Sequence, residues 1–466
     1  MTDPAGNPGA VPGGAAETIA AVSTPPGRGG IGIVRLSGPE SAPIAGQLVR
    51  LRHSLEHARA RLADVLDDAE SADAARIDEA VVTFFQAPNS YTTEDVVEIA
   101  THGSPAVLEF LLRRAVSLGA RLAEPGEFTQ RAFLSGRIDL TQAEAVCDLI
   151  DAQTLTQARQ AAGQMGGALS RRVAPVKQAL LELIALLEAG IDFAEDDIDV
   201  TPEAEIARRI AGLTPPLTAL ESSFARGRIV HEGLTLAIVG RPNVGKSSLF
   251  NRLVERDRAI VTASPGTTRD LVTERISLDG IPLELVDTAG LRESLEEAEQ
   301  LGVARSREAL ADAALVLIVL DASQPLNQEE RKLLAAVDGR PALLALNKSD
   351  LAGTRPAASE VADLPAISTS ALTGEGIQAL RQRLIELATG GAASEPGMLT
   401  NLRQHQAVST ARAALAEAAR ANAGAIPHEM ILLDLYRALW ALDSLTGQTT
   451  QDDILNLIFS TFCIGK

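Results

Sequence analysis

The chain has 466 residues, which at about 150 residues per domain predicts roughly three domains. Its 42 basic and 61 acidic residues give a formal net charge of −19, which argues against a cationic nucleic-acid binder and a polybasic membrane binder. Two cysteines, Cys147 and Cys463, exclude a disulfide framework and a four-cysteine metal site, and they suit a reducing compartment.

The amino-terminal end, residues 1–17, is expected to be a flexible tail, because it is rich in Pro, Gly and Ala. It has neither the basic start nor the apolar stretch of a secretory signal. No apolar run approaches the roughly 18 residues that a membrane helix needs. We therefore expect a soluble, cytoplasmic protein without a membrane partner.

Residues 18–132 alternate short β-type runs with turn signals and predict an α/β or α+β domain. Strands are expected at Thr18–Val22, Gly32–Ser37, Asp78–Phe85 and Asp95–Thr101, and a helix at Ser104–Leu118.

From residue 133 the pattern becomes helical, with expected helices at Leu140–Gly163, Leu169–Ile191 and Glu203–Leu220. Residues 233–389 then alternate strands and helices, which is typical of a doubly wound parallel sheet. Residues 390–466 return to helices. The simplest packing joins residues 133–232 and 390–466 into one helical domain, interrupted by the inserted sheet domain. The fold class is therefore multidomain: an α/β amino-terminal domain, an all-α domain and an inserted P-loop α/β domain.

Residues 240–247, G-R-P-N-V-G-K-S, match the phosphate-binding motif GxxxxGK[ST] between an apolar strand and an apolar helix. Backbone N–H groups at a helix N-terminus cradle phosphates, Lys246 is expected to reach the β- and γ-phosphates, and Ser247 to offer a hydroxyl to Mg²⁺.

Three further segments complete a guanine-nucleotide site. Asn347-Lys348-Ser349-Asp350 follows an apolar strand, and the Asp350 carboxylate suits the paired donors of guanine. Asp287-Thr288-Ala289-Gly290 suits the γ-phosphate and Mg²⁺, and Thr268 is the candidate second Mg²⁺ ligand. The expected GTP-binding residues are Asn243, Val244, Gly245, Lys246, Ser247, Ser248, Thr262, Ala263, Ser264, Pro265, Gly266, Thr267, Thr268, Asp287, Thr288, Ala289, Gly290, Asn347, Lys348, Asp350, Ser370, Ala371 and Leu372.

Hydrolysis needs a substitute for a water-orienting glutamine, because Leu291 stands where Ras-like GTPases usually carry it. The acidic run 293–299 offers candidates. The missing positive charge could come from Arg269 or Arg292, or from a bound cation.

Four separate segments resemble the MnmE (TrmE) family of tRNA-modification GTPases over residues 18–466. They are P-P-G-R-G-G with G-I-V-R at 25–35, P-N-S-Y-T and E-D-V-V-E at 88–98, P-G-E-F-T with R-A-F-L and D-L-T-Q-A-E-A at 125–145, and F-C-I-G-K at 462–466. The resemblance implies modification at C5 of the wobble uridine of certain tRNAs, adding an aminomethyl or carboxymethylaminomethyl group. It implies a homodimer and a heterotetramer with the partner MnmG, which carries FAD and uses NADH.

The resemblance also implies two sets of site residues. The amino-terminal domain is expected to serve dimerisation and to bind 5-formyl- or methylene-tetrahydrofolate through Arg35, Glu98, Arg137 and Lys466, with Arg137 standing where relatives have Lys. Potassium is expected beside the phosphates, held by Asn243, Thr262, Ser264 and Thr267, where it would replace an arginine finger. Glu299 falls on the catalytic glutamate that orients water.

Several alternatives stay open on the residues alone. Asn243 could be a mere turn residue, and Cys463 is either a nucleophile towards uracil C6 or, in the favoured interpretation, a packed apolar residue. Trp440 and Tyr436 are expected to face a core. A regulatory GTPase switch, for example in ribosome assembly, and a folate enzyme with a vestigial G domain are the alternative functions. For tRNA, Arg208-Arg209 and Arg226–Arg228 are the candidate basic clusters.

Overall fold

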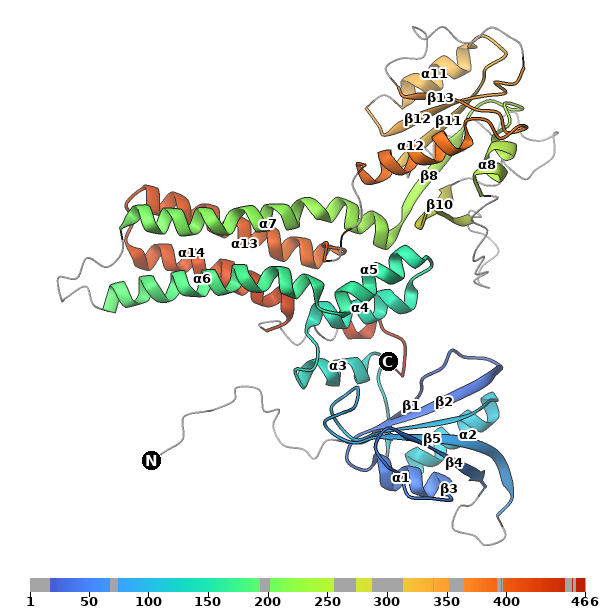
Figure 1. Cartoon of the computed structure of the whole chain (residues 1–466), viewed down its shortest axis with the longest axis vertical. Helices are drawn as coiled ribbons and strands as arrows, with labels where there is room; N and C mark the ends of the chain where they lie inside the picture. Colours follow the sequence, from blue (N-terminus) through green and yellow to red (C-terminus); the bar gives the residue numbers. More distant parts are fainter. Residues whose placement is uncertain are drawn as a thin grey trace. The chain divides into compact units, whose positions relative to one another are not determined.

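The computed structural model describes residues 17–67, 74–192, 202–254, 274–286, 313–337, 339–351, 364–391, 395, 397–448, 455 and 458–465. The chain divides into two compact units, Met1–Cys147 with Thr446–Lys466, and Asp148–Leu445. The second unit contains both a helical bundle and a sheet domain (Figure 1). The domain boundaries expected from the sequence stay a prediction, but this division shows that the carboxy-terminal segment belongs with the amino-terminal strands.

A seven-stranded sheet forms the first unit, in the order β3-β4-β5-β6-β2-β1-β7. All its pairings are antiparallel except that of β1 with β7. Its strands are β1 Ile19–Val22, β2 Gly29–Ser37, β3 Val49–Leu51, β4 Arg59–Leu66, β5 Arg76–Phe85, β6 Val96–Gly103 and β7 Arg121–Leu122. Four of these match expected strands. The other three were not predicted, because Arg and Asp interrupt the apolar pattern of β3 and β4, and β7 has only two residues.

One face of this sheet is covered by α1, Ser41–Leu48, and α2, Pro105–Ser117. Alternate strand residues such as Val34 and Ile99 are fully buried against Leu48 and Leu111 of these helices. The intervening residues, among them Arg35 and Glu98, therefore lie on the opposite face.

The carboxy-terminal residues pack beside α3, Glu127–Leu134, and the start of α4, Leu140–Asp151. Leu140, Phe459 and Phe462 are buried in one cluster, with Phe133 packed against it. This apolar contact explains why the last residues join the first unit.

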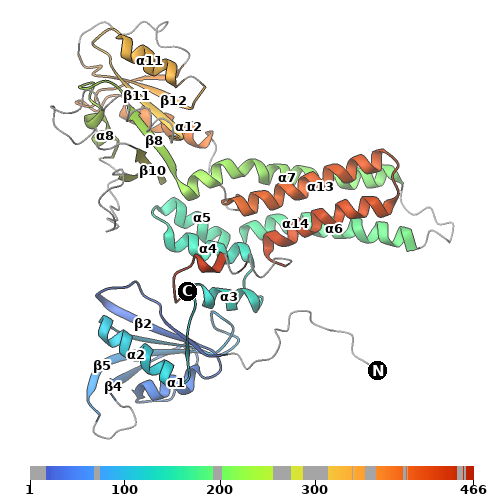
Figure 2. The ribbon, with the colours of Figure 1, turned by 180° about the vertical axis from the view of Figure 1, so that it is seen from behind.

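In the second unit, four long helices lie side by side, α6 Ala168–Asp192, α7 Glu203–Glu232, α13 Leu402–Ala423 and α14 His428–Thr446 (Figures 1 and 2). They share one core that contains Leu183, Leu217, Leu415 and Leu435. The expected union of the helices before and after the sheet domain is thus present, because their apolar stripes bury one another.

The bundle differs from the sequence prediction in three places. The expected helix Leu140–Gly163 is broken between α4 and α5, Leu155–Met165, because Thr154 caps a new helix. Helix α7 continues to Glu232 instead of ending at Leu220. Trp440 is 57% exposed, so the expectation that it faces the core is wrong.

A six-stranded sheet forms the rest of the second unit, in the order β13-β12-β11-β8-β10-β9. Its strands are β8 Leu234–Val239, β9 Glu274–Leu278, β10 Ile281–Val286, β11 Leu315–Asp321, β12 Ala342–Asn347 and β13 Ala366–Ser368, and only β9 is antiparallel to its neighbour. Helices α8, Lys246–Val254, and α12, Ile377–Thr389, contribute to the core on one face, and α11, Gln328–Ala336, to the core on the other. The predicted doubly wound sheet is confirmed.

Replacing glycine by alanine is expected to have opposite effects on stability at two positions of α7. A Cβ at Gly227 would lie 2.0 Å from the Leu399 carbonyl oxygen, whereas a Cβ at Gly212 would meet nothing within 4 Å. Alanine favours a helix over glycine by about 1 kcal/mol. We expect Gly212→Ala to stabilise the bundle and Gly227→Ala to destabilise it, measured by urea unfolding followed through Trp440, the single tryptophan. Equal changes in the free energy of unfolding for the two variants would show that α7 does not approach Leu399 this closely.

Candidate functional site

The phosphate-binding loop lies between β8 and α8 at the carboxyl edge of the parallel strands. Asn243 and Gly245 have positive φ values of 65° and 93°. A Cβ at Gly245 would lie 2.4 Å from Nδ2 of Asn347, so only glycine fits at this point. The loop thus opens α8 at Lys246, and the N-terminus of a helix at this place favours an anion.

Lys246 and Ser247 sit at the start of α8 as the motif requires. The Lys246 ammonium donates to the carbonyls of Gly240 at 2.9 Å and Arg241 at 3.0 Å, which holds the side chain across its own loop. The half-buried Ser247 adjoins it and suits the hydroxyl that Mg²⁺ takes from such loops. Among the described residues, no group of three His, Cys, Asp or Glu could hold a metal.

The base-binding segments meet the phosphate loop through one side chain, Asn347. Its Nδ2 donates to the Val244 carbonyl at 2.8 Å, and its Oδ1 accepts from the Ala371 amide at 3.0 Å. Ser370 Oγ donates to Asp350 Oδ1 at 2.5 Å, which orients the carboxylate expected to bind guanine. The structure therefore brings together the residues around 244, 347–350 and 370–371 that the sequence predicted.

Asp321, at the end of β11, is a member of this site that the sequence analysis missed. Its Oδ2 accepts from Lys348 Nζ at 2.8 Å, and Lys348 has a positive φ of 62°. Burial by itself raises the pKa of Asp321, but hydrogen bonds from Lys348 and Ser323 outweigh it and hold the pKa below its usual value. Asp321 is therefore ionised at neutral pH and fixes Lys348. In the sequence, the feature that could have indicated Asp321 is its position at the end of an otherwise all-apolar strand.

Arg252 supports the base loop from α8. It donates to the carbonyls of Ala371 and Leu372, both at 3.0 Å. The Leu372 side chain is 77% exposed, so the contact that holds this residue is the one made by its backbone carbonyl.

The other residues predicted to serve nucleotide binding and hydrolysis lie outside the described residues. These are Thr262, Ala263, Ser264, Pro265, Gly266, Thr267, Thr268, Asp287, Thr288, Ala289, Gly290 and Glu299, together with Leu291, Arg269 and Arg292.

A second polar site lies in the first unit, on the sheet face opposite α1 and α2. Arg35 and Glu98 are direct cross-strand partners, and Nε and Nη2 of Arg35 donate to Oε1 of Glu98 at 2.9 and 2.7 Å. The guanidinium also lies 5.5 Å from the centre of the Phe128 ring. This arrangement fixes both charged groups.

The carboxy-terminal segment reaches the same place. Nη1 of Arg35 donates to the Gly465 carbonyl at 3.2 Å, and Ser23 Oγ donates to the same oxygen at 3.0 Å. Residues Pro125 and Ile464 form an isolated antiparallel bridge. The next residue, Lys466, lies outside the described residues.

Tyr91 connects Arg137 with this group. Burial raises the pKa of Tyr91, against the lowering effects of its hydrogen bond with Thr129 and of the charges of Arg35 and Arg137. Arg137 also donates to the Ser90 carbonyl. Arg35 and Arg137 therefore both lie close enough to Tyr91 to act on its pKa, and Glu98 joins them through Arg35. Ser23, Tyr91 and Phe128 are neighbours of this site that the sequence pattern did not indicate.

Cys463 is exposed, contrary to the favoured expectation that it packs as an apolar residue. Its carbonyl accepts from the Gly126 amide at 3.4 Å, so the backbone is held while the side chain stays accessible.

The proposed basic clusters are engaged within the chain. Arg208 and Arg209 both bind Glu205, at 2.7 and 2.8 Å. Arg226 donates to the Thr389 carbonyl at 3.3 Å, and Arg228 lies 3.7 Å from Glu232. Arg228 is the more exposed of this second pair.

Comparison with known proteins assigns the chain to a family. Residues 140–463 match the MnmE helical domain and residues 18–137 match the GTP-binding protein TrmE N-terminus. The chain belongs to the MnmE family. It is 58% identical over 455 residues to the tRNA modification GTPase MnmE of Koribacter versatilis (strain Ellin345), covering 97% of this chain and 99% of that protein. The protein of the same name from Methylococcus capsulatus is 42% identical, covering 97% and 99%. The predicted family resemblance is confirmed.

No helix in the described part of the chain is long and apolar enough to cross a bilayer.

Proposed function

We propose that this chain hydrolyses GTP in the course of tRNA modification, at C5 of the wobble uridine. The observation that carries the proposal is the joining of the phosphate loop to Ala371 through Asn347, which supports a single site for the phosphates and a guanine base. The near full-length similarity to proteins named tRNA modification GTPase MnmE supplies the reaction class. A regulatory switch and a folate enzyme with an inactive G domain are the alternatives that the test below distinguishes.

The first test is nucleoside analysis of tRNA from cells that lack this protein and carry either the parent chain or Lys246→Ala. Because Lys246 lies across the phosphate loop, we expect Lys246→Ala to abolish GTP hydrolysis and to leave the wobble uridine unmodified. Lys332→Ala, an exposed lysine of α11, is the matched control and should restore the modification. Full modification with Lys246→Ala would contradict a role for hydrolysis.

Potassium is proposed as the charge that assists hydrolysis, held by Asn243 with Thr262, Ser264 and Thr267. The left-handed backbone at Asn243 places this exposed residue in the phosphate loop, which fits a cation ligand as well as a turn residue. Glu299 is proposed to orient the attacking water.

For the cation, we expect hydrolysis in KCl to exceed that in NaCl at equal ionic strength by roughly 100-fold, the worth of one charged or polar group in a transition-state site. Asn243→Lys should remove the dependence on potassium, because the lysine ammonium replaces the charge of the ion. Asn251→Lys, at an exposed position of α8, should leave that dependence in place. Glu299→Ala should slow turnover and leave GTP affinity nearly unchanged. Equal rates of the parent in both salts would reject the potassium site.

The amino-terminal unit is proposed to bind 5-formyl- or methylene-tetrahydrofolate at Arg35, Glu98, Arg137 and Lys466. The donor set fits such a ligand, because a fixed carboxylate can accept from ring N–H groups while arginines suit a glutamate tail. The folate would supply a one-carbon unit, and the residues of this chain would bind and orient it.

Glu98→Gln keeps an oxygen for Arg35 and removes the negative charge. We expect it to weaken binding of 5-formyl-tetrahydrofolate by about tenfold or more, measured by calorimetry, because a charged hydrogen bond contributes roughly 1.5–3 kcal/mol. Glu109→Gln, at an exposed position of α2, is the matched control. Unchanged affinity of Glu98→Gln at unchanged melting temperature would place the folate elsewhere.

The proposed partners are a second copy of this chain, tRNA, and MnmG with its FAD and NADH in a heterotetramer. Leu62 and Val81 are paired neighbours on the open sheet face, and they are 44% and 43% exposed, which supports a homodimer through this face. Because the candidate arginine clusters are engaged internally, we propose that MnmG holds much of the tRNA.

A further inference from the structure

The first turn of α5 carries two side chains that reach from the helical part to the sheet domain. Thr154 and Gln157 form a capping box, in which the Gln157 amide donates to Thr154 Oγ1 at 3.2 Å and the Thr154 amide donates to Gln157 Oε1 at 3.1 Å. The remaining donors leave the helix. The Thr154 hydroxyl donates to the Gly280 carbonyl at 2.7 Å, and Gln157 Nε2 donates to the His231 carbonyl at 2.8 Å.

Both acceptor carbonyls lie where one secondary-structure element meets the next. Gly280 lies in the turn between β9 and β10, and His231 lies at the end of α7, just before β8 and the phosphate loop. In the sequence, β9 follows the motif G-T-T-R-D at 266–270, and β10 ends at Val286, one residue before D-T-A-G. The β9–β10 hairpin therefore joins the two segments whose motifs are expected to respond to the γ-phosphate.

The same turn is also held from inside the sheet domain. Arg381 of α12 is only 4% exposed and donates to Asp279 Oδ1 at 2.9 Å and to the Leu253 carbonyl at 2.6 Å. Leu253 belongs to α8, the helix that begins with the phosphate loop. The Asp279–Gly280 turn is thus bonded to Arg381 of α12, and through it to α8, on one side, and to Thr154 of the α5 cap on the other.

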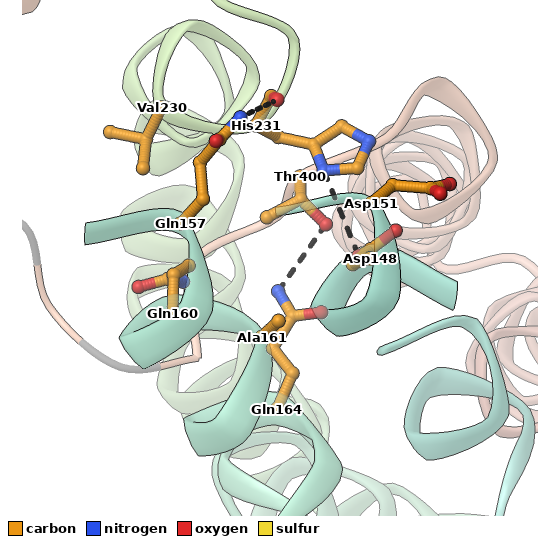
Figure 3. Close-up of a pocket in the computed structure, with 9 residues that line it drawn as sticks. All are labelled: Asp148, Asp151, Gln157, Gln160, Ala161, Gln164, Val230, His231 and Thr400. Carbon is orange, nitrogen blue, oxygen red and sulfur yellow. Dashed lines mark hydrogen bonds and ion pairs between the residues drawn. The ribbon is translucent and has the colours of Figure 1, made fainter. Parts of the chain in front are cut away.

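Beside the second contact the packing is incomplete. A cavity of about 40 Å³ is lined by Asp148, Gln160, Gln164, His231 and Thr400, among others (Figure 3). His231 Nδ1 stands 3.7 Å from Asp148 Oδ2 across it. Protein interiors are otherwise close-packed, so the Gln157–His231 hydrogen bond holds α5 to the end of α7 at a place where packing contacts are sparse.

We propose that Thr154 and Gln157 are positioning residues that pass the nucleotide state of the sheet domain to the helical bundle. Their hydrogen bonds hold the β9–β10 turn and the connection between α7 and β8 against the N-terminal end of α5. The inference rests on the proposed binding and hydrolysis of GTP.

Two substitutions remove the outward donors and keep an acceptor oxygen at each position of the capping box. Thr154→Asp retains an oxygen that accepts from the Gln157 amide but, as a carboxylate, donates nothing to Gly280. Gln157→Glu retains Oε1 and loses the donor to His231. Thr154→Ser restores the hydroxyl and is the conservative control. Asn327→Asp with Glu330 left unchanged adds one of these two negative charges at the capping box of α11, which does not involve α5.

The experiment measures the distance between spin labels placed through unnatural amino acids at Arg383 of α12 and Arg420 of α13, in the full chain. Distances are recorded without nucleotide, with GDP and with GDP–aluminium fluoride, and GTP affinity, hydrolysis and melting temperature are measured on the same preparations. Both label positions are exposed.

We expect the parent, Thr154→Ser and Asn327→Asp to show a distance that changes with the nucleotide. The double variant Thr154→Asp/Gln157→Glu should lose that change, while its nucleotide affinity stays within about threefold of the parent, since the altered groups do not touch the phosphate loop. A nucleotide-dependent change of parental size in the double variant would overturn the inference. So would a parent that hydrolyses GTP without any change in distance, and that result would leave the proposed function intact. A parent that neither binds nor hydrolyses GTP would overturn both.

Discussion

The nucleotide site depends on one buried amide, that of Asn347. The side chain is 1% exposed and both its oxygen and its nitrogen are hydrogen-bonded, to Ala371 and Val244. A buried amide that lost either partner would leave an unsatisfied polar group, at a free-energy cost of about 1–3 kcal/mol. The phosphate loop and the two base-binding segments therefore keep a fixed separation, and that separation suits a single nucleotide with its base and phosphates at opposite ends.

The polar site around Arg35 and Glu98 depends on contact between the carboxy-terminal segment and the amino-terminal strands. Arg35 lies in the second strand of the chain, yet one of its nitrogens binds the carbonyl of Gly465, the last described residue. Between them in the sequence lie the bundle and the whole sheet domain. The site is therefore complete only when the final residues have folded against α3 and α4, where Phe459 and Phe462 anchor them.

In the second unit, hydrogen bonds made at helix ends connect the helical bundle to the sheet domain. The capping box of α5 satisfies its own helix and binds two carbonyls of the sheet domain. Arg226 of α7 binds the Thr389 carbonyl at the end of α12. Carbonyls at helix ends and turns lack partners within their own element, so they are the natural acceptors for such contacts.

The sequence by itself determined the nucleotide motifs, the doubly wound sheet, the interrupted helical domain and the family, because these depend on local patterns and on residue types at fixed spacing. Only the tertiary structure decided that Asp321 holds Lys348, that Arg35 meets Gly465, and that Thr154, the N-cap of α5, donates to Gly280. Each of these joins residues far apart in the chain, and their pairing depends on the path of the backbone. Trp440 shows the same limit, since apolar spacing located its helix and only the packing of four helices showed that its ring faces solvent.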